Sequence, residues 1–179
     1  QSGSATIGVT VSNAGLASYS DDFSSGLALW RAINPPLETR GQQTEWTTRV
    51  SPADPPPPGG SEGWVKPANN DDWHGCNDAL RGQRINTAGF TRPLHVKFMY
   101  RTRGPLLLEY TADDGSSWVR VGTVPPSNEW RSHNILVDVP QGALYLRLSY
   151  TGDVRGNEAA ALGASIDDMQ VRQAPSGAP

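Results

Sequence analysis

Two pairs of adjacent aspartates, one near each end of the chain, are the strongest candidates for metal chemistry. They are Asp21-Asp22 and Asp167-Asp168. Calcium binds about six to eight oxygen ligands drawn from carboxylates, carbonyls and water. Four carboxylates supply that chemistry if the two segments come together, and without a cation they repel one another. The sequence therefore predicts a calcium site at these four residues, provided that the first and last strands of the fold are neighbours.

A second interpretation of the aspartates involves no metal. In it, one aspartate of each pair points inward and its carboxylate caps a turn by accepting backbone N–H groups. Asn77 and Asp78 are weaker candidates for additional ligands. Melting temperatures in calcium and in EDTA distinguish the two interpretations, because only a bound cation raises the stability of the folded state.

Three of the six tryptophans lie in a polar tract rich in proline and glycine. Exposed indole faces stack on sugar rings, and amphipathic indoles are common at interfaces. The candidate ligand-binding residues are therefore Trp46, Trp64, Trp73 and His74, for a glycan or a protein surface. The alternative is a satellite cluster in which the three tryptophans fix a long loop to the main core.

The sequence lacks the residue patterns of an enzyme. Hydrolysis requires two positioned carboxylates or a nucleophile with its base, whereas Glu38, Glu45, Glu62 and Glu109 occur singly. There is no G-x-S-x-G, H-E-x-x-H or phosphate-loop motif, and the three histidines have no common ligand spacing. Cys76 is the only cysteine, which excludes an internal disulfide and a cysteine-zinc cluster. We therefore expect a non-catalytic protein.

Charge and hydropathy narrow the choice of partner. The net charge is -3 and the 15 Lys and Arg residues form no basic stripe, so no nucleic-acid partner is expected. No apolar run approaches the roughly 18 residues of a membrane span, which predicts no membrane insertion. The chain begins at Gln1 without a basic-then-apolar leader, as in a processed protein that is extracellular or surface-displayed.

Glycine (19 residues) and proline (15 residues) divide the chain into short segments. Many of these alternate between apolar and polar residues, which is typical of half-buried strands. Segments with this pattern are residues 79–85, 94–101, 106–111, 118–124, 131–139, 143–150 and 165–172. Residues 113–116 (Asp-Asp-Gly-Ser) predict a hairpin turn, because Asp and Gly tolerate positive φ. Short strands with frequent turns predict an all-β sandwich or barrel.

A long Pro-rich loop excursion interrupts this pattern at residues 34–78. It contains four consecutive prolines at 55–58, and proline cannot donate to a sheet ladder. Only local strands are expected in it, near residues 45–50 and 63–65. The predicted organisation is an N-terminal extension at 1–20, a sandwich at 21–173 that includes the 34–78 insertion, and a flexible tail at 174–179.

Residues 5–11 (Ala-Thr-Ile-Gly-Val-Thr-Val) form a strand pattern ahead of a flexible Ser-Asn-Ala-Gly hinge. A detached strand of this kind can add to the sheet edge of a neighbouring subunit. The chain would then be a self-assembling structural subunit of a surface filament, or a capsid or surface decoration, joined through residues 5–11. The alternative is that the strand pairs within its own sandwich, which leaves a recognition module.

Four sequence motifs occur along the chain in the same order as in the members of one superfamily. They are DDFSSGL at 21–27 followed by Trp30, TRPLHVKFMYR at 91–101, LEYTADDGSSW at 108–118 and SIDDMQV at 165–171. Together they resemble the jelly-roll β-sandwich superfamily of MAM-like domains, Reelin sub-repeats and the accessory or adhesin domains of secreted bacterial proteases. The long Pro-rich excursion and the additional N-terminal strand depart from the pattern of that superfamily.

The resemblance implies an antiparallel jelly-roll β-sandwich in which the opening and closing strands lie near each other. It also implies a bound calcium ion, which many members hold, and the packing of Trp30, Trp118 and Trp130 on the sandwich. Because the fold hosts adhesion, carbohydrate-binding and structural domains, it names no ligand by itself. We expect a non-catalytic extracellular module for adhesion or for recognition of glycan or protein, stabilised by structural calcium.

Overall fold

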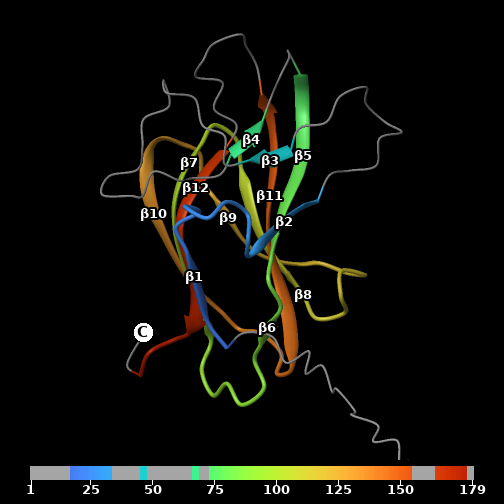
Figure 1. Cartoon of the computed structure of the whole chain (residues 1–179), viewed down its shortest axis with the longest axis vertical. Helices are drawn as coiled ribbons and strands as arrows, with labels where there is room; N and C mark the ends of the chain where they lie inside the picture. Colours follow the sequence, from blue (N-terminus) through green and yellow to red (C-terminus); the bar gives the residue numbers. More distant parts are fainter. Residues whose placement is uncertain (1–16, 34–44, 48–65, 69–72, 155–163, 177–179) are drawn as a thin grey trace, which may run out of the picture.

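The chain folds into two antiparallel sheets that pack face to face (Figure 1). The computed structural model describes residues 17–33, 45–47, 66–68, 73–154 and 164–176. Within these ranges every regular element is a strand, which confirms the predicted all-β class. The same ranges contain no helix of the length and hydropathy needed to cross a bilayer.

The first sheet contains four strands in the order β1-β12-β7-β10. Their bounds are Tyr19–Asp21 (β1), Ala164–Gln173 (β12), Leu94–Thr102 (β7) and Ser127–Val137 (β10). Burial alternates along β7 from Leu94 to Tyr100, as in a strand with one face on the core. The opening strand β1 pairs directly with the closing strand β12, so these strands are neighbours as the resemblance implies.

The second sheet has the order β2-β5-β11-β8-β9, and β6 also pairs with β11. The bounds are Trp30–Ile33 (β2), Trp73–Gly82 (β5), Ala143–Val154 (β11), Leu106–Thr111 (β8), Val119–Val124 (β9) and Ile85–Asn86 (β6). A separate ribbon pairs β3 (Glu45–Thr47) with β4 (Lys66–Ala68). The architecture is an antiparallel jelly-roll β-sandwich, as predicted.

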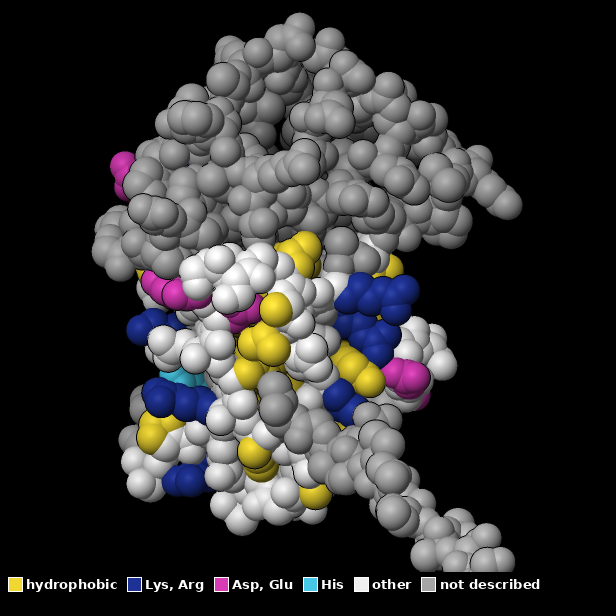
Figure 2. Space-filling model, viewed as in Figure 1, with side chains coloured by type: hydrophobic (Ala, Val, Ile, Leu, Met, Phe, Trp, Pro, Cys, Tyr) yellow, Lys and Arg dark blue, Asp and Glu magenta, His cyan; other side chains and the backbone are white. Residues whose placement is uncertain are grey.

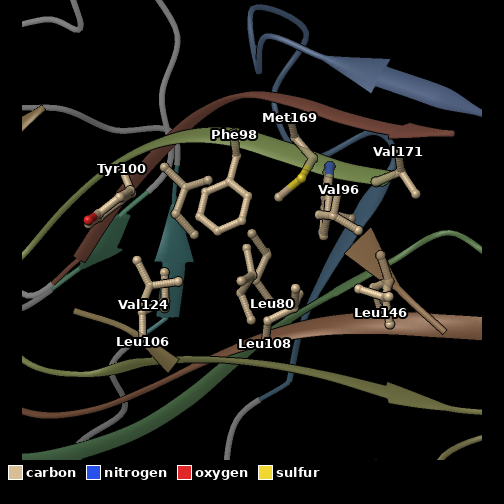
Figure 3. Packing of buried hydrophobic residues seen from close by; sticks show 14 of the residues in the cluster. Leu80, Val96, Phe98, Tyr100, Leu106, Leu108, Val124, Leu146, Met169 and Val171 are labelled. Carbon is tan, nitrogen blue, oxygen red and sulfur yellow. The ribbon is translucent and has the colours of Figure 1, made fainter. Parts of the chain in front are cut away.

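The core lies between the two sheets and follows from the two-residue period of the strands. Leu108 of β8 and Leu146 of β11 point inward from one sheet, and Val96 and Phe98 of β7 point inward from the other (Figure 3). All four side chains are at most 1% exposed. Burial of large apolar side chains is the main stabilising contribution in such a fold.

Several predicted boundaries differ from the structure, and three of the differences bear on the organisation of the chain. The long excursion does not reach residue 78, because β5 begins at Trp73 and pairs with β11 as far as Val154. The strand predicted at 79–85 is two strands, since β5 ends at Gly82 and β6 begins at Ile85. The tail does not begin at Ala174, which is 2% exposed and donates its N–H to the Pro93 carbonyl at 2.9 Å.

Gly82 marks a close approach between β5 and two aromatic side chains. A Cβ at this position would lie 2.6 Å from Tyr19 Oη and 3.1 Å from the Trp30 ring. Tyr19 and Trp30 are both buried, and their rings meet edge to face. We therefore expect Gly82→Ala to lower the free energy of unfolding by about 1–3 kcal/mol, because the packed rings have no room to move.

Urea denaturation measures this loss. Gly122→Ala is the matched control, because its Cβ would meet only a terminal methyl group of Ile135 at 3.3 Å. Equal stability losses in the two variants would contradict the close packing at Gly82.

Candidate functional site

The structure brings the two acidic pairs together. Because β1 pairs with β12, Asp21 lies opposite Met169, the residue that follows Asp168. Asp21, Asp22 and Asp168 line a hollow of about 530 Å³, together with Ser20, Ser25, Ala28, Leu29, Met169 and Gln170. The acidic residues from the two ends of the chain therefore share one site.

A β-bulge in β12 orients the second acidic pair. The register against β7 shifts between Asp167 and Gln170, and Asp168 adopts a left-handed conformation with φ 49°. This conformation is uncommon for residues other than glycine, and bulges often occur next to functional sites. The bulge reverses the alternation of side chains, so that Ile166 before it and Met169 after it are both buried.

One carboxylate oxygen of each inward-facing aspartate is held by the backbone. Asp21 Oδ1 accepts the N–H of Phe23 at 2.8 Å, and Asp167 Oδ1 accepts the N–H of Asp168 at 2.7 Å. Asp22 caps the same turn more openly, since its Oδ1 accepts the N–H and the hydroxyl of Ser24. The turn-capping arrangement is therefore present, but it satisfies only one oxygen of Asp21 and one of Asp167.

The second oxygens, Oδ2 of Asp21 and of Asp167, are buried and have no hydrogen-bond partner among the described residues. Burial raises the pKa of Asp167 to about 7; the Asp168 N–H opposes this rise, and the charges of the other three aspartates add to it. Burial also raises the pKa of Asp21. In contrast, the Ser24 hydrogen bonds lower the pKa of Asp22. The folded site thus disfavours the charged forms of Asp21 and Asp167 and favours that of Asp22.

These orphaned oxygens match the chemistry of calcium, which binds carboxylate oxygen in flexible geometry. In the part of the chain that the structure describes, no three His, Cys, Asp or Glu side chains are grouped to hold a metal by themselves. A calcium ion here would therefore take Asp21 and Asp167 as its carboxylate ligands. Backbone carbonyls and water would complete the coordination shell.

The structure describes only the backbone of three of the four predicted ligand-binding residues. Trp46 belongs to β3, while Trp73 and His74 begin β5, and β3 lies beside β5 at the top of Figure 1. The side chains of these three residues and the whole of Trp64 lie outside the described part of the structure. Residues 5–11 also lie outside it. Ligand binding by this group and self-association through the N-terminal strand both stay predictions.

The structure also shows a charged line of residues that the sequence analysis did not predict. It crosses the outer face of the second sheet, where strand register places one residue of each strand beside the next. The line consists of Arg31, Arg81, Arg147, Glu109 and Arg120, on β2, β5, β11, β8 and β9 respectively. We call these five residues the arginine row.

Aromatic rings stack on the two arginines in the middle of the row. The guanidinium carbon of Arg81 lies 3.7 Å from the centre of the Tyr145 ring, and that of Arg147 lies 4.0 Å from the Trp118 ring. Such cation–π contacts hold a guanidinium in a fixed plane. Both rings are half-buried, so this part of the sheet face is rigid and accessible.

The three tryptophans expected to pack on the sandwich differ from one another. Trp30 is in the core at 6% exposure, as predicted. Trp118 and Trp130 are half-buried and lie outside the core, where arginine side chains cover their rings. Trp118 follows the predicted hairpin turn, in which Asp114 and Gly115 have positive φ, and that turn brings the indole over Arg147.

Glu109 anchors the centre of the row. It accepts hydrogen bonds from Arg147 Nε at 2.6 Å and from the Ser149 hydroxyl at 2.8 Å. Burial alone would raise the pKa of Glu109, but these bonds and the charges of Arg147 and Arg120 outweigh it and hold the pKa below its usual value. The carboxylate is therefore ionised and serves to fix Arg147.

The lowered pKa of Glu109 predicts a pH dependence of stability. The folded chain retains the carboxylate to lower pH than the unfolded chain does, so its stabilisation is complete above the ordinary pKa of 4.5. It is lost as the pH falls from there through the folded pKa. We therefore expect the stability advantage of the wild type over Glu109→Gln to shrink below pH 4.5.

Thermal melts at neutral and acidic pH measure that advantage. Glu129→Gln is the matched control, because the Glu129 side chain is 84% exposed. A wild-type advantage over Glu109→Gln that stayed constant throughout the pH range would contradict the role of the Arg147–Glu109 pair.

Comparisons with known proteins found solved structures with a similar fold. No protein-family model matches the chain, and no curated protein matches it. The chain is similar in structure to the K3 cleaved adhesin domain of Lys-gingipain from Porphyromonas gingivalis W83, at 16% identity and a TM-score of 0.59 over 87% of this chain and 98% of that one.

A second similar structure is TmCBM61, solved in complex with β-1,4-galactotriose. It shares 16% identity and a TM-score of 0.50 over 92% of this chain and 97% of that one. At these identities the likeness concerns the fold alone, which is a β-sandwich. The resemblance to protease adhesin domains is thereby confirmed for the fold, while the MAM-like and Reelin parts of it stay predictions.

Proposed function

We propose that the chain is a non-catalytic, extracellular module for recognition or adhesion, and that its partner is a glycan. The observation that carries this proposal is the outer face of the second sheet. There, Tyr145 and Trp118 present half-buried rings beside arginine side chains. Strands hold these groups in place, and a pre-formed polar and aromatic surface is what a recognition module requires.

The fold supports the same proposal. One similar structure is named as an adhesin domain, and the other was solved with a bound galactotriose. A β-sandwich of this kind has two broad outer faces and clustered loops at each end, and these surfaces accept different ligands without a change in the core.

Trp46, Trp64, Trp73 and His74 are proposed as a second contact region. Trp46 belongs to β3 and Trp73 begins β5, and the contact between these two strands supports a shared contact region. Indole rings gathered in such a region would supply apolar contact area to a sugar or to a protein surface.

Calcium has a structural role in the proposal. A cation bound to Asp21 and Asp167 would satisfy the two carboxylate oxygens that lack partners among the described residues. It would also connect β1 to β12, because these aspartates come from the two strands. The ion would thereby hold the edge strand β1 against β12, and it would take no part in any reaction.

A glycan microarray probed with the whole chain in calcium buffer tests the proposed function. We expect binding to a defined subset of glycans, and we expect the bound glycans to be recovered intact after long incubation. Absence of binding to every glycan would contradict the proposal, and so would cleavage of the bound glycans.

A further inference from the structure

We infer that the arginine row binds an acidic polysaccharide whose sugar units carry carboxylate groups, that is, a uronic-acid chain. This inference rests on the proposed function and names the chemical class of the glycan. It is carried by the alignment of Arg31, Arg81, Arg147 and Arg120 on one sheet face. Figure 2 shows basic side chains gathered on the right of the view, at the level where Figure 1 places the turn between β8 and β9.

The stacking contacts decide between a neutral and an acidic sugar. A neutral sugar binds an open aromatic face through its C–H groups, but Arg81 and Arg147 already cover one face of Tyr145 and of Trp118. On that side of each ring the surface therefore presents guanidinium N–H groups instead of an open aromatic face. A guanidinium has five N–H donors in a planar fork that matches a carboxylate.

The row already shows its preference for carboxylates within the chain. Arg147 donates to Glu109 at 2.6 Å, and Arg81 donates to Asp114 at 2.9 Å. Each of these bonds uses one nitrogen of a guanidinium whose side chain is 21% (Arg81) or 24% (Arg147) exposed, which leaves N–H groups that a ligand would reach. The planar carboxylate of a uronic acid would extend the same pairing outward.

The charge of the surface favours an anion even though the chain is acidic overall. Among the residues that the structure describes, the four arginines of the row are opposed by two paired carboxylates, those of Glu109 and Asp114, while the net charge of the whole chain is -3. Arg31 and Arg120, at the two ends of the row, are exposed. Local charge of one sign focuses counter-ions on a face of a protein.

The shape of the surface fits a chain rather than a single anion. Five strands separated by about 4.8 Å give a row roughly 19 Å long. An extended polysaccharide running across the strands would place several of its carboxylates along that line. Contacts distributed over several units give affinity that a single sugar lacks.

The experiment compares short galacturonic acid oligomers with β-1,4-galactan oligomers of the same length by isothermal titration calorimetry. These ligands differ mainly in the carboxylate on each unit. The test variant is Arg31→Ala/Arg120→Ala, which removes the exposed ends of the row and leaves the Arg147–Glu109 pair intact. The matched control is Lys97→Ala/Arg172→Ala, which removes the same charge from exposed positions on the first sheet.

We expect the acidic oligomer to bind more tightly than the neutral one, with an affinity that falls as salt rises. The row variant should bind it roughly tenfold more weakly, as for the loss of two exposed ion pairs, while the control variant should be almost unchanged.

Other results would overturn the inference. Equal binding of the two oligomers with no effect of the row variant would leave the proposed function standing and remove the acidic ligand. Equal losses in the row and control variants would show attraction by net charge alone. Binding of dextran sulfate or double-stranded DNA without binding of the uronic acid would assign the row to another polyanion. Binding of no glycan, here or on the array, would remove the proposed function as well.

Discussion

Calcium is expected to raise the melting temperature of the metal-free chain by several degrees. At a free calcium concentration of about one hundred times Kd, a ligand that binds only the folded state adds about 2.7 kcal/mol. For a domain of this size that corresponds to roughly 5–10 °C. The physical reason is the pair of buried carboxylate oxygens, on Asp21 and Asp167, that lack partners in the described structure. Differential scanning calorimetry in calcium and in EDTA measures the shift.

Asp167→Asn separates a bound ion from a general effect of salt. The variant should lose the response to calcium, because Asp167 is fully buried and supplies one of the two proposed carboxylate ligands. In EDTA it should be at least as stable as the wild type, since it no longer places a carboxylate in a buried position that disfavours the charged form. Asp138→Asn, at an exposed position, is the matched control and should respond as the wild type does. An unchanged response in Asp167→Asn would contradict the site.

Phe98→Ala is expected to lower the free energy of unfolding by about 3–5 kcal/mol, the usual range for truncating a buried aromatic side chain. Phe98 is 0% exposed and lies between the two sheets (Figure 3). Its ring centre is 6.2 Å from that of Tyr100 and 5.2 Å from that of His133. Truncation would leave a cavity that neighbours on two sheets cannot fill, and urea denaturation measures the loss.

Two further variants calibrate that result. Phe98→Leu keeps most of the volume and should cost less than the alanine variant. Val119→Ala removes an apolar side chain that is 48% exposed and should have a small effect. If Phe98→Ala cost no more than Val119→Ala, the packing of the two sheets described for the core would be wrong.

The strands were predictable because their residues alternate. The segments around β7, β8 and β12 repeat apolar and polar positions, and the structure places strands there. The start of β5 was missed because residues 73–78 (Trp-His-Gly-Cys-Asn-Asp) do not alternate, and their strand pairing depends on the distant strand β11. Local patterns cannot show an element that only a remote partner stabilises.

The candidate sites were also predictable only in part from the sequence. Each acidic pair was visible in the sequence, and the resemblance implied that their strands are neighbours. The bulge at Asp168 was not visible, since a one-residue shift of register leaves no local signal. The arginine row was also missed, because it depends on the register of five strands. Four of the 15 basic residues, which form no stripe in the sequence, are aligned in space.

Binding of an acidic glycan on the outer face of the second sheet is the central claim, and backbone NMR tests it most directly. The isotope-labelled chain is titrated with galacturonic acid oligomers while amide chemical shifts are followed. We expect the largest changes in β5, β11 and β8, around Arg81, Arg147 and Glu109. Changes confined to the first sheet, to the acidic pairs or to the region of Trp46 and Trp73, or no changes at all, would contradict the claim.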